Sequence, residues 1–202
     1  APVSVVPLPL GSASASRLER WLMNYTLFAE AGYLLVGLGG SLVPQLQVTD
    51  VVLCQKVIAG EWADSGSEYP FDPDLTDWLR QRLTGVAEGT ALGCDRIITQ
   101  AQTKQSLHQR YGADVVEMES LAIARLLQAQ QKRLAMLRII SDDCHHDLPD
   151  ISVAIKPDGS LSPLAMTRQF LQRPLGAGRL VRGSLRALAR LEVTMVQLFQ
   201  QS

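Results

Sequence analysis

Residues 113–143 read ADVVEMESLAIARLLQAQQKRLAMLRIISDD, and this stretch decides the predicted fold. A short apolar run closes at residues 115–116, and apolar side chains then recur at helical spacing over residues 118–130. Residues 134–140 form a second apolar run, of the length expected for a buried strand. This order of strand, helix and strand predicts one βαβ unit with a right-handed crossover.

Two carboxylates stand at the junctions of that unit. Glu119 opens the helix although its helical neighbours Ile123 and Leu126 are apolar, and a carboxylate on a core-facing stripe is costly unless it is paired. Asp142 ends the second strand, and α/β sheets bind ligands at the carboxyl ends of parallel strands. Spacing alone leaves two interpretations open: two ligand-binding groups, or a helix-start carboxylate and an ordinary turn residue.

The composition is that of a folded protein and argues against several classes of function. The chain has 202 residues, of which 47% are hydrophobic and 19% charged, so we expect one domain over residues 1–202. A formal net charge of −1 gives no general attraction to nucleic acid, and no apolar run is long enough for an integral membrane segment. The three cysteines are odd in number and far apart, which argues against a disulfide framework and favours a reducing cytoplasm.

The remaining periodicity predicts an α/β domain with a twisted, mostly parallel but mixed sheet and helices on both faces. A helix over residues 16–23 would be capped by Ser14 or Ser16, and Gly112 is placed to end a helix over residues 102–110. Further elements are expected as strands at 3–6, 33–36, 51–58 and 89–99 and as helices at 75–83, 163–171 and 178–200.

Three clusters allow a functional interpretation but favour a structural one. Aromatic side chains in the loop over residues 61–74 can stack on a base, yet such rings more often pin a loop to the core. The run DDCHHD at residues 142–147 lacks the ligand spacing of a zinc site, so no metal is expected. Arginines along the last helix share a face that can bind an anionic surface, although a solvated face is favoured. These aromatics and arginines are Trp62, Tyr69, Phe71, Arg179, Arg182, Arg186 and Arg190.

Four segments carry a resemblance to a known family. VEMES at residues 116–120, continuing into LAIA, resembles the V-E-M-E-x-x-A-x-A segment of the nucleoside phosphorylase and methylthioadenosine nucleosidase superfamily. RIISD at residues 138–142 is similar to the R-x-I-S-D segment that follows there at the same separation. GLGGSLVPQLQVTDVVL at residues 37–53 resembles the family's glycine strand, and GCDRII at residues 93–98 its base-pocket segment. The resemblance implies a phosphorylase-like sheet for most of the chain.

The resemblance also implies a role for each matched residue. In that family the methionine and second glutamate of the first motif hold the ribose, which here are Met118 and Glu119. The aspartate of the second motif protonates the departing purine at N7, which here is Asp142, and the glycine strand, with Gly39 and Gly40, binds the attacking water or phosphate. The matched segments add Glu117, Ser141, Ile97 and Ile98 as substrate-binding candidates. For the two isoleucines, plain core packing is an equal alternative.

The activity that the resemblance implies is cleavage of the N-glycosidic bond of an adenosine-type purine nucleoside by phosphate or water. No cofactor is expected beyond phosphate as a co-substrate, and family members commonly place their sites near a homodimer interface. The tail, with LPD at residues 148–150 and a turn at Asp158-Gly159, is most similar to the hopanoid-associated phosphorylase branch, which implies release of adenine from a hopanoid nucleoside. A methylthioadenosine or S-adenosylhomocysteine nucleosidase is the alternative within the family.

Departures from the family pattern leave rival hypotheses open. Leu38 stands where nucleosidases of the family have a serine for the attacking water or for phosphate, and Thr49 replaces a glycine. Those nucleosidases also activate water with a glutamate on a first strand, and no matching strand precedes Val3; the sequence does not begin with Met, so we expect that this strand lies upstream or has been lost. If it is lost, the protein binds nucleosides without cleaving them. A third hypothesis is a scaffold that assembles through its arginine-bearing last helix.

Overall fold

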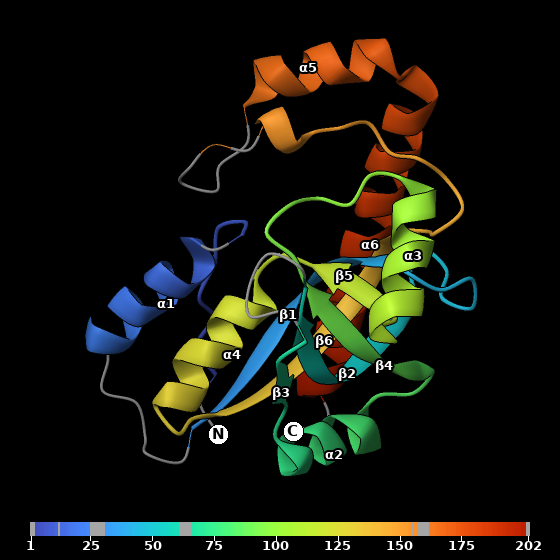
Figure 1. Ribbon diagram of the computed structural model, residues 1–202. Helices are drawn as coiled ribbons and strands as arrows, with labels where there is room; N and C mark the ends of the chain where they lie inside the picture. Colours follow the sequence, from blue (N-terminus) through green and yellow to red (C-terminus); the bar gives the residue numbers. More distant parts are fainter. Residues whose placement is uncertain are drawn as a thin grey trace.

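The computed structural model describes residues 3–11, 13–24, 31–60, 66–154, 156 and 162–200. It contains a mixed sheet with helices on both faces, which confirms the predicted fold class (Figure 1). The strands are β1 (Gly32–Ser41), β2 (Val51–Ala59), β3 (Glu68–Pro70), β4 (Val86–Gly93), β5 (Val115–Glu117) and β6 (Arg133–Asp142). The helices are α1 (Ala13–Asn24), α2 (Pro73–Arg82), α3 (Ala101–Tyr111), α4 (Ser120–Ala129), α5 (Pro163–Gln172) and α6 (Pro174–Gln200), with a 3-10 turn, η1, at Ser152–Ala154.

Strand pairing closes the sheet on itself. The order is β3-β2-β4-β5-β1-β6, and β6 also pairs with β2. β1 runs parallel to β6, and both β2 and β5 run parallel to β4. The other pairs, β1 with β5, β2 with β3 and β2 with β6, are antiparallel. In this register Gly40 of β1 faces Val116 of β5 on one side and Asp142 of β6 on the other.

The predicted βαβ unit is wrong in the direction of its strands. α4 does connect β5 to β6, but β1 lies between these strands, antiparallel to β5 and parallel to β6. β5 and β6 therefore run in opposite directions, and no parallel crossover forms. An apolar run does not encode strand direction, which is set here by the pairing of Gly40 and Ser41 with Val116 and Val115.

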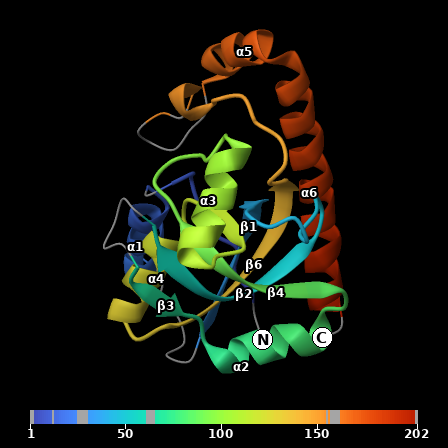
Figure 2. The same cartoon turned by 45° about the vertical axis from the view of Figure 1, so that its right-hand side comes forward.

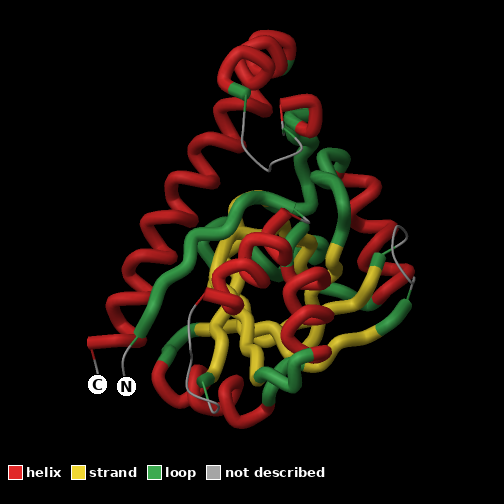
Figure 3. The backbone as a smooth tube through the Cα atoms, turned by 90° about the vertical axis from the view of Figure 1, so that its left-hand side faces the viewer, coloured by secondary structure: helices red, strands yellow, loops and turns green. Residues whose placement is uncertain are grey.

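The core lies on both sides of the sheet, with helices over each side (Figure 3). Met136 and Ile140 of β6 belong to the cluster that packs beneath α1 and α4. Leu137 and Ile139 belong to the cluster that packs against α2 and α6. Because successive side chains of a strand point to opposite faces, Arg138 lies on the α4 side.

The N-terminal segment differs from its prediction. Residues 3–6 form no strand and are mostly exposed, because the prolines that follow cannot donate to a ladder. α1 begins at Ala13, so Ser14 lies buried in the first turn and is not the cap. The segment before α1 runs instead to the end of β5, where the backbone N–H of Gly11 donates to Glu119.

Other boundaries are close to those predicted. Gly112 adopts the left-handed conformation and ends α3, as expected. The strand predicted at 89–99 begins earlier, at Val86, and stops at Gly93. The last helix begins at Pro174, four residues earlier than predicted. No helix in the described part of the chain is both long enough and apolar enough to cross a membrane.

Two of the three loop aromatics pin the segment around β3 to the body of the protein. Phe71 is buried in the core. The hydroxyl of Tyr69 accepts a hydrogen bond of 3.0 Å from Nε of Arg125 on α4, whose guanidinium also lies over the ring. Trp62 lies outside the described residues.

Candidate active site

The glycine end of β1 makes room for charged side chains from β6. A Cβ added to Gly37 would lie 2.6 Å from Nη1 of Arg138, and one added to Gly40 would lie 2.8 Å from Oδ2 of Asp142. A Cβ on Gly39 would lie 2.6 Å from a methyl carbon of Val115. The backbone of β1 is thus approached closely from both neighbouring strands, which only glycine allows. This register gathers the predicted carboxylates around one short segment.

Glu117 and Arg138 form a buried ion pair beside these glycines. Nη2 of Arg138 donates to Oε2 of Glu117 at 2.6 Å, and both side chains are 1% exposed. Oε2 also accepts from the backbone N–H groups of Glu119 and Ser120 at 3.0 and 2.8 Å, and the Ser120 hydroxyl donates to Oε1 at 2.6 Å. Glu117 therefore caps α4, because it satisfies donors that the first turn of a helix leaves open.

Glu119 shares the same arginine at a longer distance. Its Oε2 lies 3.5 Å from Nη2 of Arg138, and its Oε1 accepts the N–H of Gly11 at 3.0 Å. The side chain is 17% exposed. Burial, followed by repulsion from Glu117, raises the pKa of Glu119 above its ordinary value, although Arg138 opposes the shift. A carboxylate of this kind is held at a cost, as expected of a group that serves a ligand.

We predict opposite effects of Glu119→Gln on stability and on ligand binding. With its pKa raised, the native state binds this proton more tightly than the unfolded state, so wild-type stability falls as pH rises above the ordinary value of 4.5. Glutamine does not ionise, so the variant does not lose this stability, and its Tm at neutral pH should be higher than that of the wild type. Binding of an adenosine-type nucleoside should weaken by about 1.5–3 kcal/mol, because a charge-assisted hydrogen bond is lost.

Thermal unfolding across pH and calorimetry with adenosine derivatives measure the two effects. Glu192→Gln, at an exposed position on α6, is the matched control and should change neither quantity. Unchanged affinity in a folded Glu119→Gln variant would assign the carboxylate a purely structural role.

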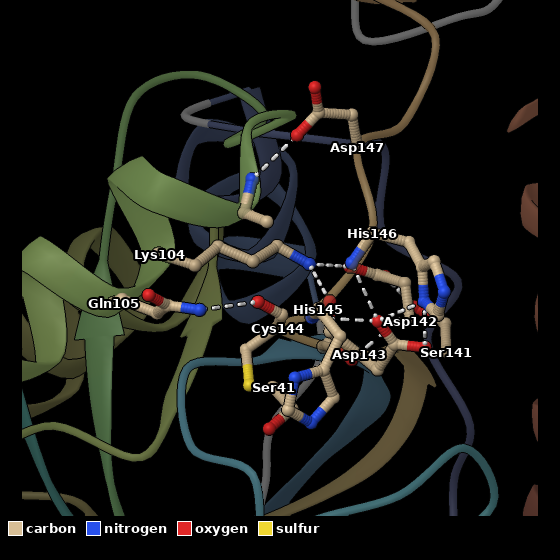
Figure 4. Close-up of polar contacts among 12 residues, drawn as sticks. Ser41, Lys104, Gln105, Ser141, Asp142, Asp143, Cys144, His145, His146 and Asp147 are labelled. Carbon is tan, nitrogen blue, oxygen red and sulfur yellow. Dashed lines mark hydrogen bonds and ion pairs between the residues drawn. The ribbon is translucent and has the colours of Figure 1, made fainter.

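Asp142 receives a donor on each carboxylate oxygen (Figure 4). The Ser141 hydroxyl donates to Oδ1 at 2.6 Å. Nζ of Lys104, which reaches over from α3, donates to Oδ2 and also to the backbone oxygen of Asp143 at 2.7 Å. Lys104 is fully buried, whereas the Asp142 side chain is 14% exposed. The pair places an ammonium hydrogen in direct contact with a carboxylate at the end of β6.

The DDCHHD run is ordered by its own hydrogen bonds. Asp143 accepts from the backbone N–H groups of His145 and His146 at 2.9 and 3.0 Å and contacts the His146 ring. Burial alone would raise the pKa of Asp143, but the hydrogen bonds from His145 and His146 outweigh it and hold the pKa below its ordinary value. Asp147 accepts from the N–H of Ala101 at 2.9 Å, at the start of α3 (Figure 4). Among the described residues no group of His, Cys, Asp and Glu is arranged to hold a metal ion.

We predict that chelators leave both stability and activity unchanged. Asp143 contacts the His146 ring and Asp147 accepts from the start of α3, and the run lacks the spaced pairs that bind zinc. Melting curves with and without EDTA check this. A lower Tm in EDTA that zinc restores would identify a metal site.

Met118 and the two isoleucines predicted to bind substrate lie in different parts of the protein. Met118 lies near the N-terminal segment, because a Cβ on Gly11 would be 3.7 Å from its terminal methyl. Ile98 is buried in a cluster behind β4 and β5, and Ile97 is half-buried. Leu38, which stands where the family pattern has a serine, packs on the α6 side with the second core cluster and not on the side of Arg138.

Sequence reasoning missed three contributors to this site. The sequence pattern could have identified Lys104, because a lysine stands at a core-facing position of α3, one turn before the buried Leu107. Arg138 lies within the RIISD motif, and its signal is that a charged residue within an apolar strand requires a partner. The backbone of Gly11 left no signal, since its contact with Glu119 joins residues 108 apart.

The chain matches the Phosphorylase superfamily over residues 1–156. It belongs to that family. A 5'-methylthioadenosine/S-adenosylhomocysteine nucleosidase of Mycobacterium bovis (strain ATCC BAA-935 / AF2122/97) is 24% identical over 144 residues, which cover 52% of this chain and 56% of the relative. The chain thus spans about half the length of the curated relatives it matches.

Solved structures of the superfamily share the fold. The native futalosine hydrolase of Helicobacter pylori strain 26695 has a TM-score of 0.59 and 18% identity, over 90% of this chain and 75% of that one. The S-adenosylhomocysteine nucleosidase of Streptococcus pyogenes, in complex with 5-methylthiotubericidin, has a TM-score of 0.59 and 19% identity over the same shares. At this identity the likeness concerns the fold alone, which is that of the superfamily.

Proposed function

We propose that this superfamily member cleaves the N-glycosidic bond of an adenosine-type purine nucleoside, with phosphate or water accepting the ribosyl group. The observation that supports the proposal is the placement of Asp142 at the end of β6 and of Glu119 just past the end of β5, since these two strands flank the glycine end of β1. One carboxylate contacts a buried ammonium, and the other is buried at a cost. Relatives named as nucleosidases make the same reaction class the natural choice.

The reaction requires two things of the site. Its transition state resembles an oxocarbenium ion with a departing base, so the sugar gains positive charge while the purine needs a proton. Asp142 protonates the purine at N7, and the neutral base leaves. Glu119, together with Met118, holds the ribose and supports its charge. Phosphate or water then attacks the anomeric carbon near the glycines of β1.

Lys104 supplies the proton that Asp142 passes on. Nζ of Lys104 lies against one oxygen of the Asp142 carboxyl group, and the Ser141 hydroxyl lies against the other. Transfer of one ammonium hydrogen from Lys104 leaves a neutral amine and a carboxylic acid, and transfer of that proton to N7 regenerates the carboxylate. Solvent restores the ammonium after the purine departs. Ser141, which donates to the other oxygen, keeps the carboxyl group oriented.

We predict that Lys104→Met lowers kcat roughly 10²-fold, because it removes both the proton and the contact that positions Asp142. The pH dependence of kcat should also change, which a purely structural defect would not cause. Gln105→Met, one residue along α3, is the matched control and should keep the wild-type pH profile. A Lys104→Met enzyme with wild-type kcat and pH profile would remove the lysine from the proton path.

Four finer proposals follow from the sequence. The substrate is a hopanoid nucleoside from which adenine is released, as the resemblance of the tail implies. The protein acts as a homodimer in the cytoplasm. It needs no cofactor other than phosphate, if phosphate is the acceptor.

Adenine release from a panel of nucleosides tests the function. The full-length protein is incubated with adenosine, methylthioadenosine, S-adenosylhomocysteine and an adenosylated hopanoid, each with and without phosphate. Release that requires phosphate identifies a phosphorylase, and release without it a nucleosidase. Binding of these nucleosides without release from any of them would contradict the proposal and leave a nucleoside-binding protein.

A further inference from the structure

α6 carries an apolar face that no described element covers. Its buried residues, which include Gly183, Ala187, Thr194 and Leu198, face the rest of the protein. A second set of apolar side chains is between 40% and 62% exposed: Val181, Leu185, Leu188, Val193, Val196 and Phe199. Most of this set follows the helical period, so it forms a stripe on the outer side of α6. From residue 181 to residue 199 the stripe is about 27 Å long.

The views of the molecule place this stripe at its periphery. α6 runs along one edge of the protein, and no described element lies beyond it (Figure 2). It continues past the sheet toward α5, where Leu171 and Leu175 are 78% and 81% exposed. Exposed apolar patches of this extent on a folded protein mark a surface that meets a partner.

Charge distinguishes the possible partners. Residues 163–200 contain six arginines and one acidic residue, Glu192, so this segment carries a net charge of +5. The whole chain carries −1, so residues 1–162 carry −6. Three of the arginines, Arg179, Arg182 and Arg186, are exposed and recur at helical steps beside the apolar stripe. An apolar stripe beside a row of arginines is the pattern of a helix that lies in the interface of an anionic membrane.

We propose that the outer face of α6 docks the protein on a membrane surface that contains anionic phospholipid. The exposed leucines, valines and phenylalanine enter the boundary between headgroups and acyl chains, and the neighbouring arginines contact lipid phosphates. A second copy of the chain fits less well, because pairing the same face about a two-fold axis brings +5 against +5. Nucleic acid fits less well, because a phosphate backbone would leave the apolar stripe uncovered.

Docking through this face keeps the candidate active site close to the membrane. α6 packs against the end of β6 so tightly that a Cβ on Gly183 would collide with the backbone oxygen of Ser141. Ser141 is the neighbour of Asp142, so the docked helix and the carboxyl end of β6 form one packed unit. The inference rests on the exposure and charge of α6 and does not depend on the proposed activity.

Vesicle flotation tests the proposal with the full chain. Vesicles of phosphatidylcholine alone are compared with vesicles that contain about one-third phosphatidylglycerol, at low and high salt. One variant, Arg182→Glu with Arg186→Glu, reverses charge beside the stripe, and another, Leu185→Gln with Val196→Gln, removes apolar contact. The matched controls lie on α1: Arg17→Glu with Arg20→Glu, and Met23→Gln, whose side chain is 76% exposed.

The expected result is flotation with the anionic vesicles that weakens at high salt. Each α6 variant should bind these vesicles roughly tenfold more weakly or worse, and each α1 variant should match the wild type. Circular dichroism and Tm confirm that the variants fold. Absence of flotation, equal binding to neutral vesicles, or wild-type flotation of both α6 variants would overturn the proposal. A further outcome would also overturn it: the wild type is a dimer that binds no vesicles, and the Leu185→Gln, Val196→Gln variant is a monomer. That result would make the face a contact between two copies of the chain.

Discussion

Asp142→Asn is expected to lower the rate of adenine release roughly 10²–10⁴-fold while leaving nucleoside binding nearly intact. A general acid contributes only as the bond breaks, so its loss acts on turnover. The contacts of Met118 and Glu119 with the ribose are made in the ground state and persist. The asparagine amide oxygen can still accept from Lys104, and its amide hydrogens can donate to the Ser141 hydroxyl oxygen, whose own hydrogen can turn to the backbone oxygen of Gly39, so the fold should be retained.

Asp143→Asn is the matched control for that variant. The two residues are adjacent, but Asp143 turns to His145 and His146, and only its backbone oxygen contacts Lys104. The rate of adenine release by Asp143→Asn should stay within a few-fold of the wild-type rate. Single-turnover rates with calorimetric binding constants measure both variants. Wild-type turnover in Asp142→Asn would remove this residue from the mechanism.

Arg138→Met is expected to destabilise the protein by about 3–5 kcal/mol, because it strands buried carboxylates. Arg138 is 1% exposed, and it neutralises Glu117 at 2.6 Å and Glu119 at 3.5 Å. Methionine fills part of the volume but offers no charge. Denaturant unfolding of the two proteins gives the difference in the free energy of unfolding. The comparison variant is Arg125→Met, at a half-buried arginine on α4 that donates to the Tyr69 hydroxyl, and it should cost far less.

A double variant separates charge from packing at the same site. Glu117→Gln with Arg138→Met removes the buried carboxylate together with its partner, so it should recover part of the stability lost in Arg138→Met. Coupling of this kind is expected only for residues in contact. Equal stability of the single and double variants would show that lost packing, and not the stranded charge, accounts for the effect.

Predictions from the sequence succeeded where local pattern and a linked motif agreed. The helix opening at Glu119 and the strand ending at Asp142 were both placed correctly, because apolar periodicity bounds them on either side. Gly112 ended α3 as predicted, since glycine adopts the left-handed conformation without strain. In each case the information lies within a few residues of the element concerned.

Predictions failed where the structure depends on distant contacts. The direction of β5 against β6 is set by pairing with the glycine end of β1, which lies about 75 residues earlier in the chain. Lys104 meets Asp142 only because α3 packs over the end of β6. The segment before α1 forms no strand, and its role, a hydrogen bond from Gly11 to Glu119, belongs to tertiary structure.

The leaving-group dependence of Asp142→Asn tests the central claim most directly. An adenosine-type nucleoside needs a proton on its base, whereas 4-nitrophenyl riboside releases a stable anion and needs none. Rates of the wild type and of Asp142→Asn are measured on both substrates. If Asp142 is the acid, the variant loses roughly 10²–10⁴-fold on the nucleoside and only a few-fold on the nitrophenyl riboside. An equal loss on both substrates would contradict the assignment, because it would show that Asp142 shapes the site without donating a proton.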